Sequence, residues 1–486
     1  MNKQIRRLGV FLMLCFVALF VQLNYVQVLR AHDLNTRPGN SRPIDQAFSR
    51  PRGTVSTADG TVVARSVASD DNFKYQREFP QKDLFGFVTG HFNFSFGATG
   101  IEAFYNDELS GRTAHQQYRS LSDLFVDHNR SGNLKLTLRK DVQETARSAL
   151  GNRKGSIVAL DPKTGAILAF WSFPSYDPNT LSAHGSKASA VKAVLEANVD
   201  KPLLPRMYRE TFFPGSTFKV LTGSVGVETG LVTPTQPSYP VVTSYTPPQT
   251  SRPLRNFGGE TCGGTLFDIL AKSCNSSFAN MGIDLGPTKM IRGVQAFGFN
   301  DRPPIDLPAS VRSRFPTNFD QNLPVLAQSS IGQNSVSATP LQMALVSAAI
   351  ANGGRMMAPH LLDEIRDGDG NRTKQARPTV WRTPISPQTA DVMRQAMVQV
   401  VQRGTATRLA IPGFEVGGKT GTAQLGSVPP TSHAWIIGWA GPPGDAKVAV
   451  AVIVERQPGT SEATGGRVAA PIAQKVMAKI LQVQGG

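Results

Sequence analysis

The segment 212–223 reads FFPGSTFKVLTG and places the hydroxyl of Ser216 three residues before the amine of Lys219. A Pro-Gly pair followed by an apolar run indicates a loop that leads into a helix, where Ser216 could serve simply as the N-cap. Residues i and i+3 share one helix face, so Lys219 can reach the Ser216 hydroxyl. A serine needs such a base to become a nucleophile, and lysine acts as one only when burial or a second cation lowers its pKa from about 10.4. The chemistry therefore requires a second cation nearby.

Length, composition and charge indicate a basic globular protein of two or three domains. The chain has 486 residues, of which 40% are hydrophobic and 8% aromatic. These values are typical of folded domains and argue against extensive disorder. The excess of 51 lysines and arginines over 35 aspartates and glutamates gives a formal charge of +16. Such a charge suits nucleic acid, anionic lipid or an acidic polymer.

The N-terminus selects among these partners. Lys3, Arg6 and Arg7 precede an unbroken apolar run over residues 8–21, and the sequence stays mostly apolar to Leu29. A helix of 22 residues is about 33 Å long, enough to cross the hydrocarbon core of a membrane. A cleaved signal peptide is the alternative, but no small-x-small cleavage site follows the run closely. We therefore expect a single-pass anchor in the cell membrane, with a cytoplasmic N-terminus and an extracytoplasmic remainder.

An exported chain is not expected to bind nucleic acid, so its basic surface should face membrane lipid or the carboxylates of an envelope polymer. Cys15 lies in the apolar run, and Cys262 and Cys274 are separated by eleven residues. In an oxidising compartment Cys262 and Cys274 either form a disulfide or remain free thiols, and the sequence leaves both open. No C-x-x-C motif occurs and the seven histidines are scattered, so neither a metal nor a cofactor is expected.

The exported chain up to Gly151 predicts a tether followed by a small α+β module. Residues 31–49 are mostly polar and predict the tether. Residues 50–67, RPRGTVSTADGTVVARSV, alternate short β-rich runs with turn signals and predict a hairpin. Residues 134–151, LKLTLRKDVQETARSALG, predict a strand followed by an amphipathic helix that ends at Gly151.

The sequence from residue 151 onward predicts a larger domain with an antiparallel sheet. Two apolar runs, 157–160 and 166–171, flank the turn sequence DPKTG. SATPLQMALVSAAIANGG, residues 337–354, predicts a buried helix capped by Ser337 or Thr339. Three consecutive β-rich runs predict neighbouring strands of one sheet: GFEVGGKTGTAQLG (413–426), HAWIIGWAG (433–441) and KVAVAVIVE (447–455).

Two further motifs follow the serine–lysine pair in the order required for one site. Ser273-Cys274-Asn275 forms S-x-N, and Lys419-Thr420-Gly421 forms K-T-G and supplies the second cation. S-x-x-K, S-x-N and K-T-G together are the signature of penicillin-binding proteins and serine β-lactamases. Each motif alone is weak, because the chain contains a second copy of each, at Ser189/Lys192, 131–133 and 163–165. Those copies lie in a polar helix, a polar loop and a hairpin turn, and in the wrong order.

The resemblance extends beyond the three motifs. Residues 155–179, SSIGQNSVSATPLQMA (329–344), and the GKTGTAQ and HAWIIGWA stretches resemble the transpeptidase domain of class B penicillin-binding proteins. RGTVSTADGTVVARS (52–66) resembles their N-terminal pedestal, and the whole is most similar to the short actinobacterial penicillin-binding protein A type. This implies an α+β multidomain protein: a membrane helix (1–30), a pedestal or dimerisation-like module (31–150), and a β-lactamase-like transpeptidase domain with an antiparallel sheet flanked by helices (151–486).

The resemblance also implies a role for each motif residue. Ser216 would attack an amide carbonyl, Lys219 would take its proton, and Lys419 would keep Lys219 neutral. The backbone amides of Ser216 and Thr422 would hold the oxyanion. Ser273 would relay the proton to the departing nitrogen. Asn275 would bind the backbone amide of the substrate. The terminal carboxylate would be bound by the K-T-G strand, through Lys419, Thr420, Gly421 and Thr422. The alternatives are a helix cap for Ser273 and Asn275 and a solvated strand lysine for Lys419.

The function expected from these residues is a D,D-transpeptidase that cross-links peptidoglycan stem peptides and is trapped by β-lactams. A class A β-lactamase needs a glutamate after S-x-N, and none occurs between Glu260 and Glu364; Asp284, Asp301, Asp306 and Asp320 match no motif. A hydrolase of the carboxypeptidase or β-lactamase kind, and a non-catalytic envelope scaffold, remain alternatives. Family resemblance suggests a membrane-embedded glycan polymerase and divisome or elongasome proteins as partners.

Overall fold

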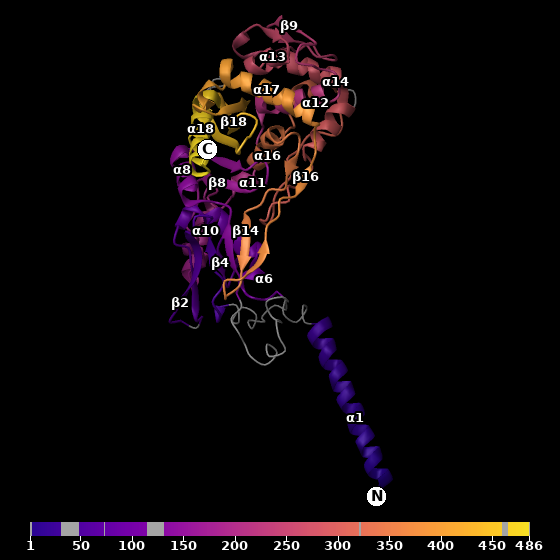
Figure 1. Ribbon diagram of the computed structural model, residues 1–486, viewed down its shortest axis with the longest axis vertical. Coiled ribbons are helices and arrows are strands. Elements are labelled where there is room, and N and C mark those ends of the chain that lie inside the picture. The colour runs from indigo at the N-terminus through magenta and orange to yellow at the C-terminus, as the bar shows by residue number, and fades with distance from the viewer. Residues whose placement is uncertain are drawn as a thin grey trace. The chain divides into compact units, whose positions relative to one another are not determined.

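The computed structural model describes residues 2–30, 48–71, 73–113, 131–319, 322–458 and 465–485 (Figure 1). Two compact units make up the chain, one of residues 1–51 and 67–76 and the other of residues 52–66 and 77–486. Most of the expected tether, residues 31–47, lies outside the described residues, as does Asp320.

The first unit contains the predicted apolar helix. Helix α1 spans Asn2–Asn24, and a π-helical turn, η1 (Tyr25–Leu29), continues it. An 18-residue window within Lys3–Asn24 has a mean hydropathy of 1.9, and none of that window is buried. Length and composition therefore allow this helix to cross a membrane.

The pedestal of the second unit is built around a small sheet. The predicted hairpin forms strands β1 (Val55–Ser56) and β2 (Val62–Ala68), with the turn at Asp59-Gly60. The strand order is β15-β14-β6-β1-β2-β3, in which β14 and β15 come from the second half of the chain. That insertion was not foreseen from the sequence. The other strands are β3 (Tyr75–Glu78), β6 (Asn133–Leu136), β14 (Leu362–Arg366) and β15 (Arg372–Gln375).

Short helices and a buried ion cluster complete the pedestal. Glu102 accepts hydrogen bonds from Arg52 Nε at 2.9 Å and from Arg77 Nε at 2.7 Å, and all three side chains are buried. Burial lowers the pKa of Arg52 to about 10. The short elements are η2 (Lys82–Leu84), α4 (Gly86–Thr89), β4 (Phe92–Asn93), β5 (Gly97–Ala98), α5 (Gly100–Phe104) and α6 (Asn106–Leu109).

A five-stranded antiparallel sheet forms the core of the larger domain, with the order β17-β18-β19-β7-β8. The two apolar runs around DPKTG form β7 (Gly155–Leu160) and β8 (Ile167–Phe173). The three later runs form β17 (Glu415–Gln424), β18 (Thr431–Gly441) and β19 (Val448–Pro458). Both groups of predicted strands are confirmed, and β17, which carries K-T-G, is an edge strand.

Helices cover both faces of this sheet (Figure 1). Helices α8 (Lys140–Leu150) and α18 (Ala470–Val483) pack against each other and against β7. Helix α16 (Pro340–Ala351) is the predicted buried helix; it contacts β7, β18 and β19, and Thr339 rather than Ser337 caps it by accepting from Gln342 N. The predicted end of α8 at Gly151 is also confirmed, with Gly151 at a φ of 61°.

The larger domain also contains the remaining helices and small strands. They are α9 (Pro178–Ser182), α10 (Ser186–Ala197), α11 (Arg206–Arg209), α12 (Lys219–Glu228), α13 (Leu266–Lys272), α14 (Asn275–Ala296), α15 (Leu323–Ser330), α17 (Pro387–Arg403), β9 (Tyr239–Val242), β10 (Ser244–Tyr245), β11 (Leu254–Arg255), β12 (Cys262–Gly264), β13 (Met356–Met357) and β16 (Val380–Arg382). Helix α17 packs against β17, and α12 packs against α14.

A buried carboxylate joins the larger domain to the pedestal. Asp306 accepts from the hydroxyl of Tyr105 at 3.0 Å and from the backbone amides of Leu361 and Leu362 at 2.7 and 2.8 Å. Burial raises the pKa of Asp306, whereas these three donors favour its charged form. Because Leu362 begins β14, Asp306 helps hold that strand in the pedestal sheet.

Candidate active site

Ser216 lies in a short turn pressed against the edge strand of the sheet. The 3₁₀ turn η4 (Gly215–Phe218) leads directly into α12, and Ser216 is 5% exposed. Gly215 has a φ of +53°, and a Cβ there would lie 2.7 Å from Thr422 O. Gly215 N also donates to Gly332 O at 3.0 Å. A glycine is therefore required for the close approach that sets Ser216 beside Thr422.

The amine of Lys219 is fully buried and contacts the second motif. Its Nζ donates to Ser273 O at 2.6 Å, to Asn275 Oδ1 at 2.6 Å and to Ser273 Oγ at 3.2 Å. Lys219 is the first residue of α12, one position after the turn that holds Ser216. The S-x-x-K lysine therefore reaches a motif more than 50 residues away in the sequence.

The amine of Lys419 meets the same hydroxyl. Its Nζ donates to Ser273 Oγ at 2.8 Å and to Thr420 O at 3.0 Å, and the side chain is fully buried. Ser273 Oγ thus accepts from both amines, which leaves its own O–H free to donate to a third atom. The second cation that the sequence required therefore lies beside the same hydroxyl as Lys219. Because Lys419 is fully buried, the alternative of a solvated strand lysine is excluded.

Ser273 and Asn275 are held by an unusual junction between two helices. Ser273 follows α13 in the left-handed conformation with a φ of 64°, and Asn275 is the first residue of α14. Between them Cys274 forms a disulfide with Cys262 of β12. The sequence left this pairing open. The bond ties the centre of the S-x-N motif to a neighbouring strand.

The K-T-G strand is fixed by close packing and by one neighbour that the sequence did not reveal. A Cβ at Gly421 would lie 2.8 Å from Thr217 Cγ2 and 2.9 Å from Pro214 O, so the strand and the turn can touch only at a glycine. Thr405 Oγ1 and Thr420 Oγ1 are 2.6 Å apart and share a hydrogen bond. Thr405 lies in a loop without a motif, so no local signal could have marked it.

A cleft of about 620 Å³ opens over these residues. Its lining includes Ser216, Asn275 and Thr422, one residue from each motif region, together with Arg255 and Gln424, which the sequence did not single out. Hydroxyl, amide and guanidinium groups therefore surround Ser216, as recognition of a peptide requires.

The duplicate motifs take no part in this cleft. Ser189 and Lys192 lie on α10, where Lys192 forms an ion pair with Glu196. The other copies lie at the start of β6 and in the turn between β7 and β8. Among the described residues no group of three or more histidine, cysteine, aspartate or glutamate side chains could hold a metal ion.

Comparison with known proteins assigns the family. The model of the penicillin binding protein transpeptidase domain matches residues 155–478, and that of the penicillin binding protein A dimerisation domain matches residues 52–134. The peptidoglycan D,D-transpeptidase PbpA of Mycolicibacterium smegmatis is 38% identical, and the protein of the same name from Mycobacterium tuberculosis is 36% identical; each match covers 99% of both chains.

Solved structures agree with this assignment. Penicillin-binding protein A from M. tuberculosis, as an imipenem acyl-enzyme complex, has a TM-score of 0.82 and 34% identity over 90% of this chain and all of that one. PBP2 of Pseudomonas aeruginosa in complex with WCK 5153 has a TM-score of 0.74 and 27% identity over 89% and 96%.

The chain therefore belongs to the penicillin-binding protein transpeptidase family. Its similarity along the full length is to the penicillin-binding protein A type. The family and the α+β multidomain fold predicted from the three ordered motifs are confirmed.

Proposed function

We propose that this protein is a membrane-anchored serine D,D-transpeptidase that cross-links peptidoglycan stem peptides through an acyl-enzyme on Ser216. The observation that carries the proposal is the convergence of two buried lysine amines on the Ser273 hydroxyl, beside the turn that holds Ser216. The names of the full-length relatives and the β-lactam acyl-enzyme complexes of a similar structure support it.

Acylation begins with removal of the Ser216 proton. Lys219 is the proposed base. Its three donated hydrogen bonds belong to the ammonium form, whereas its burial and the nearby amine of Lys419 favour loss of one of those protons to give the neutral amine that accepts the Ser216 proton. Ser216 Oγ attacks the carbonyl before the terminal D-alanine, and its proton passes to Lys219. The backbone amides of Ser216 and Thr422, whose residues lie together across Gly215, are the proposed oxyanion donors.

Breakdown of the tetrahedral intermediate needs a proton on the departing nitrogen. Ser273 is the proposed donor, because its oxygen accepts from both lysines and its O–H can point into the site. Lys219 can return a proton to Ser273 through their hydrogen bond. The C–N bond breaks, D-alanine leaves, and the acyl group remains as an ester on Ser216.

The remaining motif residues are proposed to position the donor peptide. Asn275 lines the cleft and would hold its backbone amide. Lys419, with the hydroxyls of Thr420 and Thr422, would hold the terminal carboxylate, and Gly421 allows the strand to lie against the turn. Attack by an amine of a neighbouring stem then releases the cross-linked product. A β-lactam acylates the same serine and stays attached, because its leaving group remains part of the adduct.

The anchor and the partners complete the proposal. We place the N-terminus in the cytoplasm and the catalytic domain outside, from the basic residues in the first turns of α1, which precede its apolar run. We keep the boundaries 1–30, 31–150 and 151–486 for anchor, pedestal and catalytic domain, with β14 and β15 as a catalytic-domain insertion in the pedestal sheet. Membrane lipid, a membrane-embedded glycan polymerase and divisome or elongasome proteins are the proposed partners.

Labelling with a fluorescent penicillin tests the nucleophile. The wild-type protein should form a covalent adduct that survives denaturation, and the Ser216→Ala variant should form none. Ser189→Ala is the matched control, because it removes the serine of the duplicate S-x-x-K on the exposed face of α10. Labelling that persists in Ser216→Ala would remove the mechanism. Steady release of hydrolysed penicillin at about 1 per second, an ordinary enzymatic rate, would instead identify a hydrolase.

A further inference from the structure

Arg255 is the one charged residue among the described residues that line the cleft over Ser216. The other lining residues carry hydroxyl, carboxamide or apolar side chains, apart from Gly258. The side chain of Arg255 is exposed, so a ligand in the cleft can reach it. A few precisely placed polar or charged groups usually fix the orientation of a ligand and its specificity. The charge of Arg255 therefore indicates an anionic group on the ligand at this point of the cleft.

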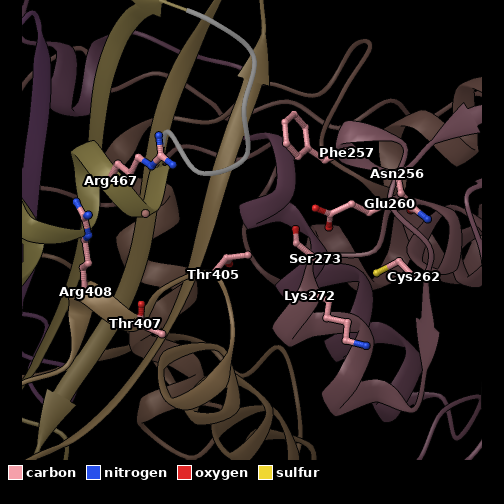
Figure 2. A pocket seen from close by; sticks show the side chains of 11 residues that line it. Asn256, Phe257, Glu260, Cys262, Lys272, Ser273, Thr405, Thr407, Arg408 and Arg467 are labelled. Atoms are coloured by element: carbon pink, nitrogen blue, oxygen red, sulfur yellow. The ribbon is translucent and has the colours of Figure 1, made fainter.

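Other charged side chains of this region belong to a neighbouring pocket of about 340 Å³, which Figure 2 shows. Four charged residues line that pocket: Glu260, Lys272, Arg408 in the turn η6 (Thr407–Leu409) and Arg467 in the π-helical turn η7 (Gly465–Ala469). The two pockets adjoin at Asn256 and Phe257, which line both. Glu260 lines only the neighbouring pocket. Among the described residues, therefore, no acidic side chain lines the cleft to neutralise Arg255.

The backbone of Arg255 is fixed, whereas its guanidinium is available to a ligand. Within the described part of the chain, no ion pair or hydrogen bond occupies this guanidinium. Arg255 O accepts from Asn275 Nδ2 at 3.0 Å, and Arg255 pairs with Ser244 in the small sheet of β10 and β11. The next residue, Asn256, ties β11 to α14, because its Oδ1 accepts from Ser276 N at 2.9 Å. Arg255 is therefore held beside the first turn of α14, where the S-x-N motif ends.

The contact between Asn275 and Arg255 indicates which part of the donor the guanidinium meets. Asn275 Nδ2 carries two N–H donors, and Arg255 O uses one of them, which leaves the other for the backbone amide of the donor. In the proposed mechanism the terminal carboxylate of the donor lies on the K-T-G strand and the scissile carbonyl lies at Ser216. A donor that continues past the amide at Asn275 next meets Arg255. The group beside Arg255 then belongs to the residue that precedes the D-alanine pair.

We propose that Arg255 is a specificity-determining residue of the donor cleft, and that it binds a carboxylate on the side chain of the residue before the D-alanine pair. An arginine fork suits a carboxylate, because it donates two parallel, charge-assisted hydrogen bonds. The acyl side chain of a penicillin takes the same position, since its amide corresponds to the donor amide at Asn275. The inference rests on the proposed function and adds to it the charge of the donor that the enzyme prefers.

Two penicillins that differ by one carboxylate test the subsite. Benzylpenicillin and carbenicillin, its derivative with a carboxylate on the acyl side chain, each compete with a fluorescent penicillin for the full chain in detergent, which gives the rate of acylation by each. The quantity compared is the ratio of the carbenicillin rate to the benzylpenicillin rate, in which any general loss of activity cancels. Arg255→Gln should lower this ratio about fivefold, the size expected for a charge pair at an exposed site.

Two further variants show whether the charge of Arg255 is responsible. Arg255→Lys keeps the charge but loses the fork, and its ratio should lie between those of the wild type and Arg255→Gln. Arg252→Gln is the matched control, because Arg252 is exposed in the same segment but does not line the cleft, and it should keep the wild-type ratio. An unchanged ratio in Arg255→Gln overturns the proposal, even if both rates fall, because Arg255 would then only support Asn275. An equal fall of the ratio in Arg252→Gln also overturns it.

Donor peptides test the same preference without a β-lactam. Two N-acetylated tripeptides, with glutamate or glutamine directly before the D-alanine pair, differ only in the side-chain carboxylate, and release of D-alanine gives kcat/KM for each. Wild type should prefer the glutamate peptide about fivefold, and Arg255→Gln should show no preference. Equal values for the two peptides in the wild type overturn the assignment of the carboxylate to the donor. Absence of any penicillin adduct in the wild type would instead refute the proposed function itself and the subsite with it.

Discussion

The catalytic cleft and the pedestal both bury charged side chains, but they neutralise them in different ways. In the pedestal, Arg52 and Arg77 share the carboxylate of Glu102, and the three charges form a compact cluster. In the cleft, Lys219 and Lys419 donate to oxygens of uncharged groups, above all to the Ser273 hydroxyl. A carboxylate fixes a neighbouring cation in its charged form, whereas an uncharged oxygen allows an amine to gain and lose a proton. The pedestal pattern therefore suits structure and the cleft pattern suits catalysis.

The largest expected effect comes from removing the amine that is proposed as the base. Lys219→Ala should slow acylation of Ser216 by penicillin by about 10³-fold, within the range for loss of a general base. Stopped-flow or gel-based acylation rates measure this effect. Lys192→Ala, which alters the duplicate motif, is the control and should leave the rate unchanged. A Lys219→Ala protein that acylates at even a tenth of the wild-type rate would show that the cleft amine is not the base.

A change in the pedestal cluster should lower the unfolding free energy of the protein and leave the acylation rate of Ser216 unchanged. Glu102→Gln leaves two buried guanidiniums without their shared carboxylate and should cost about 3–5 kcal/mol of unfolding free energy. Glu78→Gln is the matched control, because the Arg65–Glu78 pair is exposed and contributes about 1 kcal/mol or less. Denaturant unfolding gives both values. The acylation rate of the folded fraction should stay at the wild-type level. A lower acylation rate in folded Glu102→Gln protein would show that the pedestal cluster also affects catalysis, and would contradict the difference between the two regions.

Acid adds a buried cation to the catalytic sheet when His433 is protonated. Burial, with a smaller contribution from Arg456, lowers the pKa of His433 from 6.5 to about 4. Between these values the unfolded chain binds a proton that the native chain rejects, so stability is lost as the pH falls from 6.5 to 4. The expected loss is about 3 kcal/mol. His433 pairs with Ala423 on the catalytic strand β17.

A His433→Gln variant isolates this contribution. Glutamine keeps an oxygen that can accept from Arg456 N, as His433 Nδ1 does at 3.3 Å, but it does not titrate. Melting temperatures from pH 7 to pH 4 should fall less steeply for the variant than for the wild type. Equal slopes would assign the acid sensitivity to other groups.

The smallest expected effect concerns the hydroxyl behind the K-T-G strand. Thr405→Val removes the hydrogen bond to Thr420 Oγ1 and should lower kcat/KM for the donor about fivefold, as loss of roughly 1 kcal/mol implies. Thr405→Ser restores the hydroxyl and should restore the rate. Failure of the serine variant to rescue would mean that the threonine methyl, and not the hydrogen bond, supports the strand.

Local sequence patterns predicted most of the secondary-structure elements and the motifs of the site. The hairpin at Asp59-Gly60, the capped helix within residues 337–354 and the strands around DPKTG follow from turn residues and periodicity within a few positions. Each of the motifs S-x-x-K, S-x-N and K-T-G occurs twice, and their order along the chain indicated which copy of each belongs to the site. These features are legible in the sequence because each depends on the conformation of neighbouring residues.

The tertiary structure decided what distant segments do together. It brought Ser273 between Lys219 and Lys419, paired Cys262 with Cys274, and placed β14 in the pedestal sheet. Side chains separated by tens or hundreds of residues meet only because packing of the whole chain fixes their positions, and no local pattern records that packing. The sequence alone thus predicted the candidate reacting groups, and the fold determined which of them lie within hydrogen-bonding distance of one another.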